Sequence, residues 1–238
     1  MRHIIAVLML FSAPIAALAQ DVELELVLLT DASGSIDAIE LELQRRGYAN
    51  AMTSPEVLAA IADTAGGVAV TYVEFADTTD VIVPWMVIGG ATDARRFADA
   101  LMGAPRESIG GNAIGAALLY SLDLIEKNDF NGWRKVIDFS SDSLWNGSGP
   151  PIASARQAVL DAGITINGLP VLCLDCSGRP TGPNLEQEYL DRLIGGSGAF
   201  MVTADGDESF ETAVRRKMVL EIAGTPVPAD PRRRVAMD

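Results

Sequence analysis

Three oxygen-bearing side chains lie two residues apart in the segment Asp31-Ala32-Ser33-Gly34-Ser35. One carboxylate and two hydroxyls form the kind of hard-oxygen ligand set that Mg²⁺ or Mn²⁺ prefers. Gly34 lets the backbone curl, so side chains that would alternate along a strand can converge on one point. The same residues also fit a site without metal, in which Ser35 caps the following helix and Asp31 ends a strand. The segment therefore indicates a divalent-cation site and leaves a purely structural role open.

The elements that would position this segment alternate between strands and helices. The predicted strands are 22–30, 68–75, 79–83, 133–139, 164–172 and 199–203. The predicted helices are 35–52, 54–65, 92–103, 113–127, 152–162, 186–194 and 208–222. This pattern is typical of a doubly wound α/β fold: a mostly parallel sheet with one antiparallel edge strand, here 79–83 closed by Pro84 and Trp85, and helices on both faces. Ligands bind such sheets beyond the carboxyl ends of the strands, where residues 31–35 should lie.

Two details of this pattern can be checked against a structure. On the first predicted helix, Ile36, Ile39 and Leu43 are expected to lie near one face. Asp138 is a carboxylate within an otherwise apolar strand. Because burying an unpaired carboxylate is costly, Asp138 should have a hydrogen-bond partner, and we interpret it as structural.

The segment Asp31–Ser35 resembles the first motif, Asp-x-Ser-x-Ser, of von Willebrand factor type A (vWA) domains, which forms part of their metal-ion-dependent adhesion site (MIDAS). Residues 110–118 and 136–142, around Asn112 and Asp142, are similar to the second and third motifs, in the same order. The likeness covers roughly residues 22–224 and is closest to an uncharacterised branch of exported bacterial proteins, a domain of unknown function. The resemblance implies that Ser33 and Ser35 are direct ligands, that Asp31 and Asp142 are direct or outer-shell carboxylates, and that a partner's carboxylate completes the coordination.

Two positions depart from the family's pattern. Asn112 stands where the family has Thr; its amide oxygen can bind a hard cation, but Asn is also a preferred N-cap and a helix is predicted directly after it. Asp142 is followed by Ser143, Leu144 and Trp145, whereas the family usually has Gly at once. Asp142 could therefore be a solvated carboxylate at a strand end. A working cation site and a degenerate, metal-free site both remain open.

The composition limits the chemistry. The 238 residues are 49% hydrophobic, enough for one well-buried domain. With 32 acidic against 18 basic residues, the surface should repel nucleic acids. The only histidine, His3, falls in a segment with the features of a secretory signal peptide: Arg2, an apolar run over 4–18, and a small-residue cleavage pattern at 17–19. The mature chain would then contain no histidine, which excludes a Ser-His-Asp triad and a His-ligated zinc site.

Cys173 and Cys176 form a Cys-Leu-Asp-Cys pair after a predicted strand. No helix follows that would lower the pKa of a thiol, and exported proteins favour disulfides, so we expect a local structural disulfide rather than a redox pair. The basic, proline-rich residues 225–238 should form a disordered tail, to which we assign no function.

These observations predict three segments: a signal peptide over 1–19, one vWA-like domain over 22–224, and the tail. We expect a periplasmic or secreted protein, without a membrane span in its mature form, that binds Mg²⁺ or Mn²⁺ and a carboxylate of an unknown protein or peptide. We do not expect an enzyme. One alternative is a metal-free interaction scaffold; a less favoured one is a hydrolase whose ion activates water, since Ser33 stands where a second carboxylate would be needed.

Overall fold

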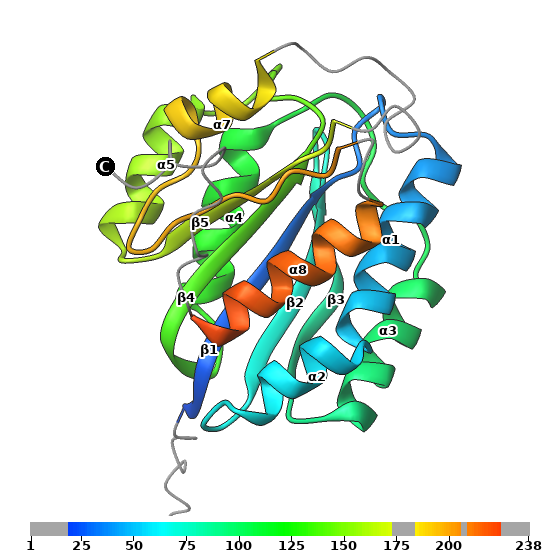
Figure 1. The fold of residues 1–238 in the computed structure, drawn as a ribbon. Coiled ribbons are helices and arrows are strands. Elements are labelled where there is room, and N and C mark those ends of the chain that lie inside the picture. The colour runs from blue at the N-terminus through cyan, green and yellow to red at the C-terminus, as the bar shows by residue number, and fades with distance from the viewer. Residues whose placement is uncertain (1–18, 173–183, 206–208, 225–238) are drawn as a thin grey trace, which may run out of the picture.

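The computed structural model describes residues 19–172, 184–205 and 209–224. Within these ranges one five-stranded sheet has the strand order β3-β2-β1-β4-β5 (Figure 1). The strands are β1 (Gln20–Asp31), β2 (Val68–Phe75), β3 (Thr79–Ile88), β4 (Phe130–Ser141) and β5 (Thr165–Pro170). The helices are α1 (Ala38–Met52), α2 (Pro55–Ala62), α3 (Ala91–Gly103), α4 (Ile114–Glu126), α5 (Ile152–Asp161), α7 (Leu185–Arg192) and α8 (Phe210–Ala223).

The pairing of the strands confirms the predicted doubly wound sheet. Strand β1 lies at its centre and pairs in parallel with both β2 and β4, and β4 pairs in parallel with β5. Strand β3 is antiparallel to β2 and forms one edge. The chain passes from β1 to β2 on one side, whereas β4 lies on the other side of β1. The strand order therefore reverses between β1 and β4.

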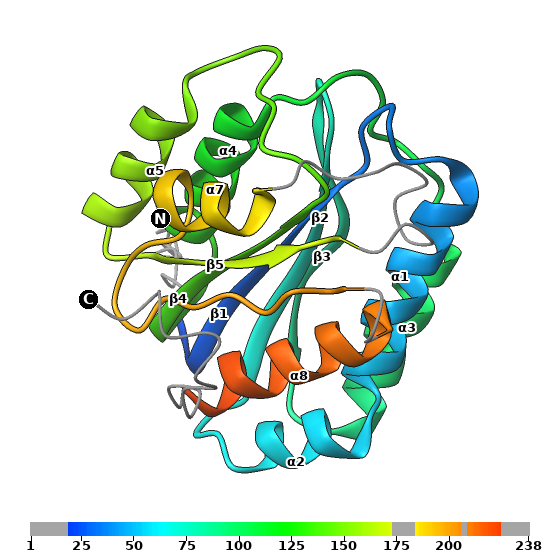
Figure 2. The same ribbon diagram turned by 45° about the horizontal axis from the view of Figure 1, so that its top comes forward.

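Helices cover both faces of the sheet, as Figures 1 and 2 show. Because successive side chains of a strand point to opposite faces, β1 contributes to two cores. Leu24, Leu26 and Leu28 pack in the cluster formed with α1, α2, α3 and α8. Val27 and Leu29 pack in the opposite cluster, with α4, α5 and α7. A strand buried on both faces forms a rigid support for the loop at its end.

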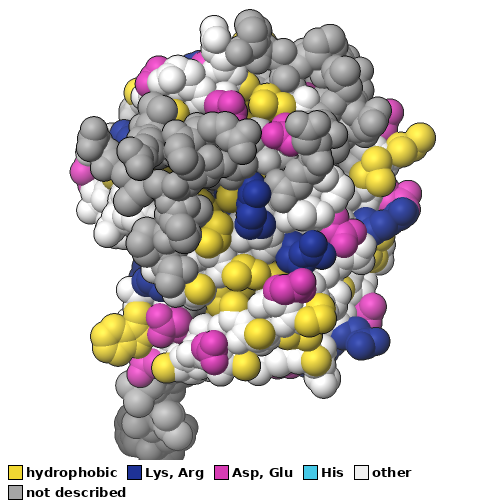
Figure 3. Space-filling model, viewed as in Figure 1, with side chains coloured by type: hydrophobic (Ala, Val, Ile, Leu, Met, Phe, Trp, Pro, Cys, Tyr) yellow, Lys and Arg dark blue, Asp and Glu magenta, His cyan; other side chains and the backbone are white. Residues whose placement is uncertain are grey.

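The ends of the described domain lie at the edge of the sheet where the parallel strands begin (Figure 1). The backbone N–H of Gln20 donates to the carbonyl oxygen of Asp129, just before β4. At the end of α8, the guanidinium of Arg134 donates to the carbonyl oxygens of Glu221 and Ile222. On the face covered by α8 and α2, acidic and basic side chains are interspersed (Figure 3). None of the helices in the described ranges is long and apolar enough to cross a membrane.

Helix α1 begins later than predicted and buries a different face. Asp37 is its N-cap: the carboxylate accepts from the N–H groups of Ile39 and Glu40, while the Glu40 carboxylate accepts from the Asp37 N–H. This capping box fixes the start at Ala38. The predicted face was wrong, because Ile39 and Leu43 are 71% and 41% exposed. Arg45 is buried instead, paired with a buried carboxylate of β2.

Two strand predictions also differ from the structure. Strand β3 continues past Pro84, where its register with β2 shifts, and this irregularity accommodates a residue without an N–H. The segment 199–203 is not a strand. It makes only isolated bridges, between Met201 and Gly168 and, just beyond it, between Ala204 and Val171. The cysteines, residues 1–18 and the tail lie outside the described residues.

A buried ionic cluster joins α8 to the sheet. The Lys217 ammonium forms ion pairs with Asp138 of β4 and Glu221 of α8, and all three residues are at most 2% exposed. Asn167 of β5 donates to Glu221 at 3.2 Å. Burial and the nearby Asp138 carboxylate raise the pKa of Glu221 to about 8, although Lys217 and Asn167 act in the opposite direction. The partner of the buried Asp138 is therefore the Lys217 ammonium, through an ion pair.

Candidate metal centre

The candidate site lies where β1 and β4, neighbouring parallel strands, both end. Asp31 is the last residue of β1, and Asp142 directly follows β4. The strand order reverses between these two strands, and open α/β sheets bind ligands at such a point. The architecture therefore brings the first and third sequence motifs together.

The first motif forms a tight loop, which we call the serine loop (Asp31–Ser35). The Oδ1 atom of Asp31 accepts a hydrogen bond of 2.8 Å from the Ser33 N–H. The Oγ atoms of Ser33 and Ser35 are 3.0 Å apart. Two hydroxyl oxygens at this separation can both contact one small cation. Asp31 and Ser33 are 1% and 2% exposed, so the loop holds them away from bulk water.

Asp31 anchors the loop to the neighbouring strand. Its Oδ2 atom accepts a hydrogen bond of 2.6 Å from the Ser141 hydroxyl of β4. Burial raises the pKa of the Asp31 carboxyl, and the hydrogen bonds from Ser141 and Ser33, together with the charge of Arg106, act in the opposite direction. Both carboxylate oxygens already accept hydrogen bonds from protein groups. Asp31 is therefore placed to orient the loop and to supply negative charge close behind the two hydroxyls.

The second motif lies directly against the serine loop. The Gly34 N–H donates to the Gly110 carbonyl oxygen at 2.7 Å, and a Cβ on Gly34 would lie 3.3 Å from that oxygen. Gly110 has φ +109°, a conformation that favours glycine. Asn112, two residues further, is 4% exposed. The glycines thus let this segment approach closely enough to bring Asn112 to the site.

Asn112 does not cap the following helix. The N-cap of α4 is Ala113, whose side chain makes no capping hydrogen bond. The Asn112 Nδ2 atom lies 3.5 Å from the Ser143 Oγ atom, a long contact, and its buried Oδ1 atom has no hydrogen-bond partner among the described residues. The N-cap interpretation was therefore wrong. A buried amide oxygen without a donor is costly unless something else at the site satisfies it.

The third motif continues into a loop that is tied to the second. Asp142 is 8% exposed. The Gly147 N–H donates to the Asn112 carbonyl oxygen at 2.7 Å. Asn146 accepts from the Gly115 N–H and donates to the Pro150 carbonyl oxygen, both at 3.0 Å. Backbone and side-chain contacts thus hold all three motif segments together around one edge of the sheet.

Comparison with known proteins identifies the family. A family model described as "Protein of unknown function (DUF1194)" matches residues 21–226. The chain belongs to the DUF1194 family. No curated protein matches it in sequence.

Solved structures share the fold of this DUF1194 domain. The proximal thread matrix protein 1 of the mussel byssus, in a structure with a zinc-occupied MIDAS motif, is 17% identical with a TM-score of 0.58; the alignment covers 84% of this chain and 46% of that one. The vWF domain of the type V pili tip protein Mfa5 from Porphyromonas gingivalis is 12% identical, with a TM-score of 0.57 and coverages of 83% and 94%. The pilus adhesin SpaC from Lactobacillus rhamnosus GG is 15% identical, with a TM-score of 0.57 and coverages of 84% and 30%.

These likenesses show that the DUF1194 domain has the vWA-type fold. The chain spans less than half of the mussel protein and less than a third of the pilus adhesin. At these identities the comparison concerns the architecture of the domain. The chemistry of the site has to be argued from its own residues.

The residues of the DUF1194 site fit a hard divalent cation better than a soft one. Two hydroxyls and one amide oxygen are neutral oxygen donors, and carboxylates lie beside them. Among the described residues, no group of three or more His, Cys, Asp or Glu is arranged to hold a metal. The candidate site is built mainly from Ser and Asn oxygens, so it is not a group of that kind. The Asn112 Oδ1 atom, which has no hydrogen-bond partner among the described residues, is the oxygen that a bound cation would satisfy.

Two residues that position the site were not predicted from the sequence. The Ser141 hydroxyl donates a hydrogen bond to Asp31. The only sequence signal for this role was that Ser141 directly precedes Asp142. The Arg106 guanidinium donates to the carbonyl oxygens of Ala32 and Ser33, at 2.7 and 3.2 Å. No motif marks Arg106, because it reaches the serine loop from the segment after α3.

Proposed function

We propose that this DUF1194 domain binds a divalent cation, Mg²⁺ or Mn²⁺, and uses it to hold an acidic group of a partner protein. The Asn112 Oδ1 atom carries the proposal: it is buried and has no hydrogen-bond partner in the part of the chain that the structure describes, and its segment hydrogen bonds to the serine loop. A bound cation would satisfy this oxygen. Without one, the fold would bear the cost of a buried, unpaired acceptor.

The chain's own groups would divide the task between them. Ser33 and Ser35 would offer their hydroxyl oxygens and Asn112 its amide oxygen. Asp31, already hydrogen bonded at both oxygens, would supply negative charge close to the hydroxyls, and Asp142 would act directly or through water. A bound divalent ion supplies positive charge at the rim of the sheet. Because the nearest donors are mostly neutral, they leave that charge largely uncompensated, which favours an anionic ligand from outside.

The fold comparisons support a role in protein binding. The mussel protein was solved with a zinc-occupied MIDAS motif, and two other neighbours are described as a pilus tip protein and a pilus adhesin. We therefore include Zn²⁺ beside Mg²⁺ and Mn²⁺ as an ion to be tested. A protein ligand with an exposed Asp or Glu is the partner class that fits this chemistry.

A binding role outside the cytoplasm is part of the proposal. The only histidine of the sequence is His3, inside the segment with signal-peptide features. We propose that this segment is removed during export to the periplasm or beyond. The mature chain would then lack the histidine on which many hydrolytic sites depend, and we propose that it is not an enzyme.

The proposal is tested by titrating Mn²⁺ into the purified domain and following binding by calorimetry and by electron paramagnetic resonance. We expect one site in the wild type and a loss of at least about tenfold in affinity in the Ser33→Ala/Ser35→Ala variant, because each hydroxyl is a direct ligand. Asn112→Ala should weaken binding as well. Ser154→Ala is the matched control: Ser154 is exposed on α5, and among the described residues its hydroxyl donates only to the Pro151 carbonyl oxygen.

Equal Mn²⁺ affinity in the wild type and the double serine variant would refute the metal site. The domain would then be a metal-free interaction scaffold. Adding acetate or a short Asp-containing peptide to the Mn²⁺-loaded wild type tests the second step. The peptide should bind with Mn²⁺ present and be released by a chelator.

A further inference from the structure

A groove runs from the candidate cation site along α5 and α7. It consists of two cavities of about 490 and 450 Å³, both of which are lined by Asn146 and Arg192. The second cavity is also lined by Asp142, so it begins at the cation site. The first is lined by Ile152 and Arg156 of α5. We call the two cavities together the arginine groove.

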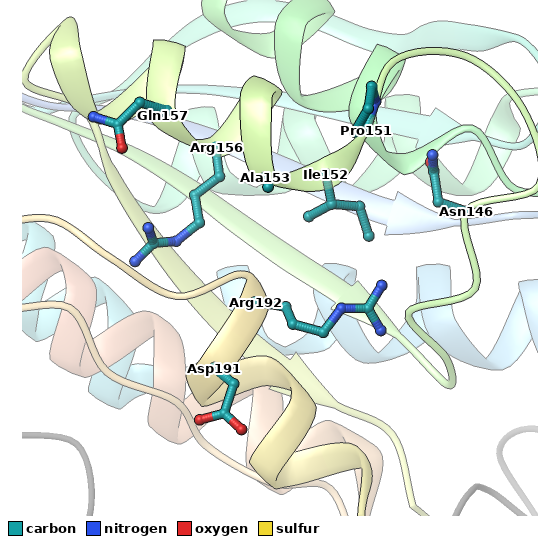
Figure 4. A pocket seen from close by; sticks show the side chains of 8 residues that line it. All are labelled: Asn146, Pro151, Ile152, Ala153, Arg156, Gln157, Asp191 and Arg192. Carbon is teal, nitrogen blue, oxygen red and sulfur yellow. The ribbon is translucent and has the colours of Figure 1, made fainter.

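The side chains of the first cavity point in different directions, as Figure 4 shows. Ile152, Arg156 and Arg192 extend into the space between α5 and α7. Asp191 and Gln157 are directed away from it. The charged side chains that extend into this first cavity are therefore the two guanidinium groups. Asp142 and Glu188 line the second cavity, together with Arg192.

The two arginines differ in how firmly they are held. The Arg156 guanidinium donates to the carbonyl oxygens of Leu193 and Ile194 directly after α7, at 2.7 to 3.2 Å, so its position is fixed. Arg192 forms an ion pair with Glu188 at 2.7 Å, but their side chains are 48% and 43% exposed. Such exposed pairs are weak and exchange readily. Arg192 can therefore turn to an anion that enters the groove.

The loop after Asp142 lines the second cavity together with Arg192. An Arg192 guanidinium nitrogen lies 3.4 Å from the Leu144 carbonyl oxygen, and Leu144 is only two residues from Asp142, which an extended chain spans in about 7 Å. Trp145 is 64% exposed, and its ring packs on Gly147, where a Cβ would lie 2.4 Å from the indole. A large apolar surface thus lies beside the positive charge.

We propose that the arginine groove binds an acidic, extended segment of the partner protein, with one acid at the cation and a second acid on Arg192. The inference rests on the proposed function for its first contact. Charge complementarity selects the occupant: a carboxylate can form a paired, charge-assisted contact with a guanidinium. Trp145 would cover the chain between the two acids. A partner with a single acid would use only half of this surface.

The experiment uses fluorescently labelled peptides with two Asp residues separated by about one to four residues, a range set by the span of an extended chain. Each peptide is paired with one in which the second Asp is Asn. Binding to the Mn²⁺-loaded full domain is followed by fluorescence anisotropy. At one spacing, Arg192→Glu should lower the affinity for the two-acid peptide about tenfold, because attraction is replaced by repulsion. The affinity for the one-acid peptide should stay unchanged.

Arg46→Glu is the matched control. Arg46 forms the same kind of pair with the residue four positions earlier, Glu42, at similar exposures of 52% and 57%, but on α1. It should leave both peptides unaffected. Mn²⁺ affinity, measured separately, should not fall in Arg192→Glu, since Arg192 is not a ligand and a carboxylate near the site attracts the cation.

Three results would overturn the inference: equal affinity of the wild type and Arg192→Glu at every spacing, equal affinity for one- and two-acid peptides, or no binding of any two-acid peptide. A two-acid peptide that binds in an Arg192-dependent way without any cation would support the groove and contradict the proposed metal function. The two proposals can therefore fail separately.

Discussion

The buried carboxyl of Glu221 should make the stability of the domain fall as the pH rises. Its pKa is about 8 in the folded chain and 4.5 ordinarily. Between these values the folded state holds a proton that the unfolded state has released. The stabilisation is therefore complete below about pH 4.5 and is lost as the pH rises through 8. At neutral pH Glu221 is then protonated, and its contact with Lys217 is a hydrogen bond to a neutral acid.

The magnitude follows from proton linkage. With these two pKa values, the contribution of Glu221 to the free energy of unfolding decreases by about 3.5 kcal/mol between pH 5 and pH 8. Glu221→Gln removes this titration and keeps an oxygen that can accept from Lys217 and Asn167. From pH 5 to pH 8, the free energy of unfolding of the variant should therefore rise by about 3.5 kcal/mol relative to that of the wild type.

The assay is urea unfolding of the wild type and the variant at several pH values between 5 and 8, followed by circular dichroism. Glu42→Gln serves as the control, because Glu42 is 57% exposed and its loss should leave the pH profile parallel to that of the wild type. Parallel profiles for Glu221→Gln and the wild type would refute the reasoning. They would mean that Glu221 is ionised in the folded protein over this pH range.

Three further substitutions test the supports of the candidate site. Ser141→Ala removes the donor to the buried Asp31 Oδ2 atom and should lower the free energy of unfolding by about 1–3 kcal/mol, measured in urea; an unchanged midpoint would contradict that anchoring role. Gly110→Ala places a Cβ 2.3 Å from the Asp77 Oδ2 atom at φ +109° and should cost about 1–3 kcal/mol, visible as a lower melting temperature. Arg106→Met removes donors to two carbonyl oxygens of the serine loop and should weaken Mn²⁺ binding about fivefold in calorimetry, a loss that Arg106→Lys should partly restore.

The sequence predicted the architecture well because strands and helices differ in periodicity and the parallel order follows from their alternation. It also predicted that the chain segments of Asp31, Asn112 and Asp142 meet, since motifs after parallel strands share one edge of the sheet. What it missed depends on contacts between distant residues. Ile39 and Leu43 fit an apolar face, but the capping box at Asp37 and the burial of polar side chains set the face that packs.

The role of Asn112 could not be decided from its type. Asn is both a good N-cap and a possible ligand, and only the backbone shows that α4 begins at Ile114 with Ala113 as its N-cap. The strand predicted over 199–203 was wrong for a related reason. Its apolar residues favour a strand, but only single bridges to β5 form, and no continuous ladder develops. Pairing is a property of two segments, and one segment alone does not determine it.

The two ends of the domain both lie where the parallel strands begin, and the candidate site lies where they end. Strand β1 alone, Gln20–Asp31, separates the two edges by roughly 36 Å at the usual rise per residue. Anything that tethers the domain through Gln20 or Gly224, whether a surface or another module, would present the serine loop outward. A large ligand could then reach the serine loop without steric hindrance from the surface or module to which the domain is tethered.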